Sequence, residues 1–134
     1  AAGSVLQLSN LSSQALKVKN TGKQTETSRA IRTNMLKACF TLMKNTIAKA
    51  GNKYIFIRLI TPDGKILSLP SPEYITDYSG LKTEISAKRE INYQNENTEV
   101  CIYYEVETEL SVGKYMVEVY ADKHKIGISS FALK

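Results

Sequence analysis

The chain has no tryptophan, one histidine and two cysteines among its 134 residues. Its only histidine, His124, stands between Lys123 and Lys125 in an expected hairpin turn, where solvent exposure and like charge do not favour a tuned general base. No GxSxG, P-loop, HExxH or GxGxxG motif occurs. We therefore expect no catalytic residues and no enzymatic activity.

Metal-binding patterns are also missing. Cys39 and Cys101 lie far apart, with no CxxC motif and no histidine at ligand spacing, which excludes a zinc site. The polar segment 94–99 offers oxygen atoms but lacks the several aspartates and the glycine of a calcium loop. The glutamates of segment 105–109 alternate along a predicted strand and are interpreted as its solvated face. The sequence thus predicts no metal and no cofactor.

Long hydrophobic runs are absent as well. No run approaches the roughly 18 apolar residues that cross a bilayer, so the sequence predicts a soluble chain that meets a membrane only through segments outside it. Hydrophobic residues make up 43% and charged residues 23%, which is ordinary for a globular protein and too apolar for a disordered one. The length suits a single domain over residues 1–134.

Acidic residues are scarce in the first half of the chain. Residues 1–60 hold ten lysines and arginines against one acid, Glu26, whereas residues 61–134 hold eight basic and twelve acidic residues. The asymmetry fits either a basic binding face or pairing between early and late strands. Because the basic residues are spread singly, we favour pairing and expect no nucleic-acid partner.

Strand patterns dominate what is present. Alternation or β-branched content predicts strands at 34–43, 53–60, 65–69, 81–87, 99–107, 113–121 and 125–133. Thr61-Pro62-Asp63-Gly64 is a turn signal, because proline presets φ and glycine supplies a positive φ. Residues 1–33 are a less certain region, with either short strands at 4–10 and 13–19 or a helix over 8–18, which its serine and asparagine content disfavours. A polar loop is expected at 20–33, in which 28–32 could form one helical turn. The pattern predicts an all-β sandwich of seven or eight strands with Greek-key connections.

Most of the chain resembles a known family. The segments concerned are CFTLMKN (39–45), YIFIRLITPDGKIL (54–67), KREINY (88–93), VCIYYE (100–105) and LSVGKYMVEVYADKHKIGISSFALK (110–134). They are similar to the immunoglobulin-like C-terminal domain of bacterial envelope-associated coiled-coil proteins of unassigned role. The resemblance implies an immunoglobulin-like sandwich in an exported or periplasmic, cell-envelope context, and it carries no catalytic residues.

In an immunoglobulin-like order, the strands at 54–60, 113–121 and 125–133 are the C, F and G neighbours of one sheet. Alternation then puts an unusually apolar set on the outward face, which either docks on a protein partner or is covered by residues 1–33. An ion pair between Arg58 and Glu118 would fix orientation there. The candidate interface residues are Tyr54, Phe56, Arg58, Met116, Glu118, Tyr120, Ile126 and Ile128.

The same order makes the strands at 34–43 and 99–107 the B and E neighbours. Cys39 and Cys101 then point outward on one face and form a possible cross-strand cysteine pair, either reduced or bonded.

These expectations describe a non-catalytic interaction or structural module of a larger envelope-associated protein. It would bind a protein partner, or a second copy of itself, through the apolar outer sheet face. The alternative is a glycan-binding module whose contacts are the loop tyrosines Tyr74, Tyr78 and Tyr93.

Overall fold

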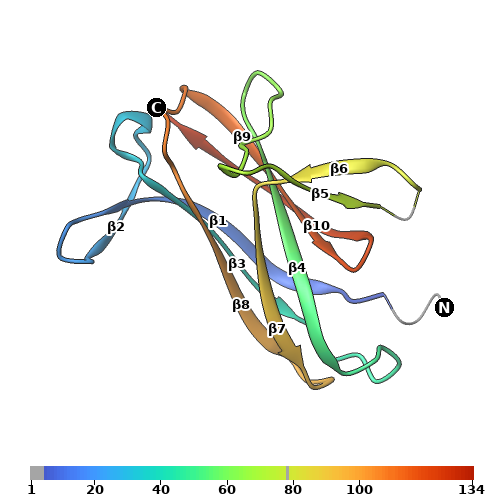
Figure 1. The fold of residues 1–134 in the computed structure, drawn as a ribbon. Coiled ribbons are helices and arrows are strands. Elements are labelled where there is room, and N and C mark those ends of the chain that lie inside the picture. Colours follow the sequence, from blue (N-terminus) through green and yellow to red (C-terminus); the bar gives the residue numbers. More distant parts are fainter. Residues whose placement is uncertain (1–4, 78) are drawn as a thin grey trace.

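The computed structural model describes residues 5–77 and 79–134 and shows an all-β fold (Figure 1). Among these residues, no helix is long and apolar enough to cross a membrane. A 3₁₀ turn, η2, covers Ala30–Arg32. The ten strands are β1 (Leu8–Val18), β2 (Gln24–Thr27), β3 (Met35–Leu42), β4 (Gly51–Ile60), β5 (Glu73–Thr76), β6 (Lys82–Ile85), β7 (Ala87–Tyr93), β8 (Thr98–Glu105), β9 (Gly113–Ala121) and β10 (His124–Leu133).

Two four-stranded sheets form an immunoglobulin-like sandwich (Figure 1). One sheet has the order β2-β1-β3-β8 and the other the order β10-β9-β4-β7, and every ladder is antiparallel. The predicted neighbours are therefore confirmed: β3 lies beside β8, and β4 and β10 lie on either side of β9. A third, two-stranded sheet consists of the β5–β6 hairpin.

The two packed sheets contain eight of the described strands, which confirms the expected seven or eight, and the β5–β6 hairpin is additional. Two short strands, β2 and β5, lie where no strand was expected, and β7 is a full strand. Conversely, segment 65–69 forms only an isolated bridge, Ile66 with Ile60, in place of a hairpin strand. Pro70 and Pro72 follow that bridge and have no N–H to donate to a ladder, so pairing stops there.

Residues 8–27 belong to the first sheet. In place of two short strands, β1 is a single long strand that pairs with β2 and β3 and shifts register between Ser9 and Ser12. Asn10 has a φ of 56° at this shift, a conformation that asparagine tolerates better than most residues. The Ser13 and Ser129 hydroxyls lie 3.1 Å apart, which ties β1 to β10 in the opposite sheet.

The core lies between the two sheets, where alternating residues of both inner faces meet. On β4 and β9, Ile55, Ile57, Val117 and Val119 are each at most 1% exposed. Tyr115 is fully buried in the same layer, and its hydroxyl donates to the Ser111 carbonyl at 2.7 Å. This bond from the start of a strand back to the preceding loop is the tyrosine corner of β-sandwiches, and it fixes the loop that enters β9.

Candidate functional site

The outer sheet face is the outward side of β4, β9 and β10, where the candidate interface was predicted. The register places Phe56 opposite Tyr120, and Glu118 opposite both Arg58 and Ile128. Cross-strand partners share a face of a sheet. The structure therefore brings together most of the predicted candidates, from strands far apart in sequence.

Ile126 does not belong to that face. The ladder between β10 and β9 shifts between Lys125 and Gly127, so that Ile126 has no partner on β9. Its side chain is partly buried against the core. Simple alternation assigned it outward, and the extra residue at this bulge is the physical reason for the error.

Exposure is uneven across the outer sheet face. Tyr54 is 46% exposed and Ile128 is 56% exposed, whereas Glu118 and Tyr120 between them are 7% and 6% exposed. The Tyr54 and Phe56 rings stack with centroids 6.1 Å apart. The face thus presents two apolar edges, and its centre is closed to solvent.

A charged cluster fills that centre. The Arg58 guanidinium donates to a Glu118 oxygen at 2.7 Å, and the Lys125 ammonium lies 3.0 Å from the other oxygen. The Tyr120 hydroxyl lies 3.5 Å from the same carboxylate. The hydrogen bond with Glu118, followed by its charge, raises the pKa of Lys125 above its usual value. One carboxylate thus links three strands of the sheet through two cations.

The β5–β6 hairpin lies beside this cluster. The Arg58 Nε donates to the Glu84 carbonyl of β6 at 3.0 Å, and Lys88 of β7 pairs with Glu73 of β5 at 2.8 Å. Residues 8–27 lie in the other sheet, so the expectation that residues 1–33 cover this face is wrong for them. The contacts there come from Glu73, in a segment that was assigned no strand, and from Glu84, within the strand predicted at 81–87.

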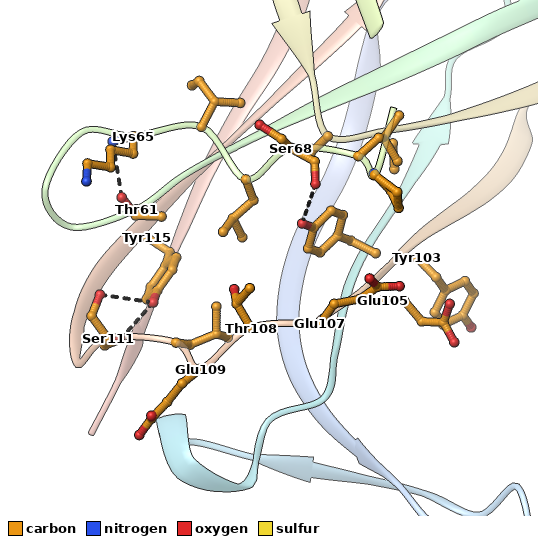
Figure 2. Close-up of a pocket in the computed structure, with 18 of the residues that line it drawn as sticks. Thr61, Lys65, Ser68, Tyr103, Glu105, Glu107, Thr108, Glu109, Ser111 and Tyr115 are labelled. Atoms are coloured by element: carbon orange, nitrogen blue, oxygen red, sulfur yellow. Dashed lines mark hydrogen bonds between the residues drawn. The ribbon is translucent and has the colours of Figure 1, made fainter. Parts of the chain in front are cut away.

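A cavity of about 840 Å³ opens at one end of the sandwich, and we call it the end pocket (Figure 2). It lies between the loop after β4 and the loop after β8. Apolar side chains including Ile66, Leu67 and Leu110 line it, together with charged residues from both loops. Figure 2 shows Glu105, Glu107 and Glu109 from one side and Lys65 from the other.

Hydrogen bonds hold the walls of the end pocket. Tyr104 donates to the Ser68 carbonyl at 2.8 Å. Tyr115 donates to the Ser111 carbonyl, as the dashed lines between these two labelled residues in Figure 2 show. Burial, followed by the charge of Glu107, raises the pKa of the Tyr104 hydroxyl. The glutamates of segment 105–109 were interpreted as one strand face, but β8 ends at Glu105 and the other two lie on the loop. Both tyrosine hydroxyls donate to backbone carbonyls within the protein.

Of the loop tyrosines, Tyr74 and Tyr93 do not form a common platform. Tyr93 is fully buried, and its hydroxyl donates to the Met43 carbonyl at 2.8 Å, so it is wrong as a glycan contact. Tyr74 on β5 is 49% exposed, with the Lys82 ammonium 4.5 Å from its ring centroid. Tyr78 lies outside the described residues. Alternation along β7 could have predicted the burial of Tyr93.

The two cysteines lie opposite each other on β3 and β8 and are joined by a disulfide, with Cα atoms 4.1 Å apart. Both are half-buried on the outward side of their sheet. Beside them, the Lys37 ammonium lies 5.7 Å from the centroid of the Tyr103 ring.

Among the described residues, no group of three or more histidine, cysteine, aspartate or glutamate side chains could hold a metal ion.

Comparisons with known proteins give one family and a shared fold. A family model described as a domain of unknown function, DUF8428, matches residues 9–134. No curated protein matches the chain. Two crystal structures of a β-glucosidase from Kluyveromyces marxianus, one selenomethionine-labelled and one with glucose, superimpose with TM-scores of 0.52 and 0.51 at 14% and 16% identity.

These superpositions cover 98% and 96% of the chain, which itself spans 14% of the length of the β-glucosidase. An immunoglobulin-like protein from Pseudomonas aeruginosa aligns over the whole of both chains, at 12% identity and a TM-score of 0.46. At such identities the likeness concerns the fold alone.

Proposed function

The chain belongs to the DUF8428 family, and we propose that it is a non-catalytic interaction module that binds protein through its outer sheet face. The observation that carries the proposal is the exposure of Tyr54 and Ile128 on either side of a closed ionic centre. Apolar anchors at the edges supply contact area, and the fixed cluster gives the face a defined shape. Following the family resemblance, we place the module in an exported, envelope-associated bacterial protein.

A second copy of the chain is the partner that fits this face best. Cations and carboxylates are balanced there: Arg58, Lys88 and Lys125 stand among Glu73, Glu90 and Glu118. A two-fold interface brings a surface patch against itself, so it requires such self-complementary charge. A partner of one predominant charge would not use a balanced face in this way.

The glycan-binding alternative has less support. Of its three tyrosines, Tyr93 is buried, and Lys82 stands over the ring of Tyr74. A sugar needs an open aromatic face to stack on, and a lysine over that face competes with it.

The test is the mass of the chain as a function of concentration, measured by sedimentation equilibrium. We expect a reversible dimer for the wild type and a monomer for Phe56→Asp/Ile128→Asp, with circular dichroism unchanged. Ile47→Asp is the matched control, because Ile47 is 67% exposed but lies on the loop between β3 and β4, away from this face. A wild-type monomer at every concentration, or dimerisation equally impaired by the control, would overturn the proposal.

A further inference from the structure

Most basic residues of the first half of the chain have no acidic partner in the described structure. Of the ten within residues 1–60, only Lys53 and Arg58 form ion pairs, with Asp122 at 3.9 Å and Glu118 at 2.7 Å. Pairing between early and late strands therefore accounts for little of the charge asymmetry. The reason is topological: β1 pairs with β2 and β3, which come from the same basic half.

Five of the eight unpaired cations of the first half gather at one end of the sandwich, which we call the basic end. It carries Lys17, Lys19, Lys23, Arg29, Arg32, Lys114 and Lys134, and Glu26 is the one carboxylate on the β1–β2 hairpin and the 3₁₀ turn. The β1–β2 hairpin, the 3₁₀ turn and the C-terminus lie together on the left of Figure 1.

Hydrogen bonds between residues far apart in the sequence hold these segments together. The Ala30 N–H donates to the Lys134 carbonyl at 2.9 Å, and the Lys134 N–H donates to the Ser28 carbonyl at 2.7 Å. The Asn34 side chain bonds both the N–H and the carbonyl of Val18, at 2.8 and 2.9 Å. The acidic loop after β8 reaches the same region, since the Val106 N–H donates to the Asn34 carbonyl. The cations are thus carried on a fixed framework bordered by that loop.

An exposed isoleucine stands among these cations. Ile31 is 77% exposed, between the exposed Arg29 and Arg32. The turn beneath it is closed, because Thr33 donates to the Arg29 carbonyl through its hydroxyl and to the Ala30 carbonyl through its N–H. Ala30 is 6% exposed and anchors the turn in the core. Ile31 is therefore held outward by its backbone.

We propose that the basic end docks on an anionic lipid bilayer surface, with Ile31 entering the interface and the surrounding cations meeting the headgroup phosphates. An exposed isoleucine flanked by two exposed arginines on a basic end suits the bilayer interface, where apolar burial and attraction to anionic lipid add together. A nucleic-acid backbone would use the cations but has no place for the isoleucine. This contact is made by the chain itself, beyond the expectation that only outside segments meet a membrane.

Co-sedimentation of the full chain with vesicles tests the proposal. The probes are vesicles of phosphatidylcholine alone and vesicles of equal parts phosphatidylcholine and phosphatidylglycerol. We expect binding to the anionic vesicles only, weakened at least ~10-fold by Arg29→Glu/Arg32→Glu and by added salt. Ile31→Ser is expected to weaken it about threefold without changing its salt dependence. Lys19→Glu/Lys23→Glu measures whether the β1–β2 hairpin of the basic end contributes to vesicle binding independently of the 3₁₀ turn.

The opposite end of the sandwich provides matched controls. Ile47 is 67% exposed on the loop after β3, with Lys44 and Lys49 as exposed neighbours, and that loop lies at the lower right of Figure 1. We expect Ile47→Ser and Lys44→Glu/Lys49→Glu to bind like the wild type. Failure of the wild type to bind anionic vesicles would overturn the proposal, as would equal losses in the controls. Salt-dependent binding to duplex DNA that Ile31→Ser leaves unchanged, without vesicle binding, would identify a nucleic-acid surface instead.

Discussion

The outer face of each sheet carries a strong link between an early and a late strand. On the first sheet Cys39 is bonded to Cys101, 62 residues later, and on the second Arg58 pairs with Glu118, 60 residues later. The chain lengths enclosed are nearly the same, but one link is covalent and the other ionic. The disulfide persists when the chain unfolds and limits the unfolded ensemble, whereas the ion pair exists only in the folded state. The two links have similar topology, but the disulfide acts on the unfolded state and the ion pair acts on the folded state.

Breaking the covalent link should have the largest effect. Cys39→Ser/Cys101→Ser is expected to lower the free energy of unfolding by on the order of 4 kcal/mol, because the closed loop is long. Chemical denaturation of both proteins under oxidising conditions measures the difference. Reductant should destabilise the wild type by a similar amount and leave the double variant unchanged. Equal stability of the oxidised and reduced wild type would show that the bond does not constrain the chain in this way.

Breaking the ionic link should have a smaller effect. Glu118→Ala is expected to lower the free energy of unfolding by about 2–3 kcal/mol, because Arg58 and Lys125 would face each other without the carboxylate. The Glu118 and Arg58 side chains are 9% and 21% exposed, so solvent screens the loss only in part. Chemical denaturation again provides the measurement.

The matched control is the exposed pair of Lys88 and Glu73, whose side chains are 43% and 42% exposed. Glu73→Ala should change the free energy of unfolding by less than about 1 kcal/mol. If the two substitutions have equal effects, the burial of Glu118 does not add to the strength of its interactions.

Both links could be predicted from the sequence, because each depends on the alternation of inward and outward side chains along a strand. Phe40 and Leu42 point inward on β3, which fixes Cys39 outward, and the order of an immunoglobulin-like sheet then supplies the neighbouring strand. The same reasoning places Arg58 and Glu118 on one face. Where a ladder is regular, local periodicity and the order of the strands are enough to predict which residues share a face and lie opposite each other.

What the sequence did not provide depends on irregular or long-range contacts. The bulge at Ile126 breaks the period by one residue, and the mark of it in KIGIS is Gly127, because a glycine inside a strand often accompanies a bulge. The β5–β6 hairpin reaches the outer sheet face through backbone and surface bonds that leave no hydrophobic pattern. The end pocket joins two loops about forty residues apart, so neither loop alone indicates it.

The smallest effect that we expect is on the pH dependence of stability, which should differ between the two links. Glu118 raises the pKa of Lys125, first through a hydrogen bond and then through its charge. Because the pKa in the folded state lies above the unfolded value of about 10.4, the stabilisation by this contact is complete below that pH. It is lost as the pH rises through the folded value. The disulfide has no proton to lose, so its contribution does not follow this titration.

Glu118→Gln keeps the size of the side chain and removes its charge, so it should return the pKa of Lys125 towards its ordinary value. NMR titration of the lysine side chains gives that pKa directly in the wild type and the variant. Glu73→Gln is the control: it should lower the pKa of Lys88, which Glu73 raises, and leave Lys125 unchanged. A Lys125 pKa that is the same in wild type and Glu118→Gln would mean that the ammonium does not hold the position 3.0 Å from the carboxylate in solution. The ionic link would then consist of Arg58 and Glu118 alone, and the outer sheet face would carry one mobile cation at its edge.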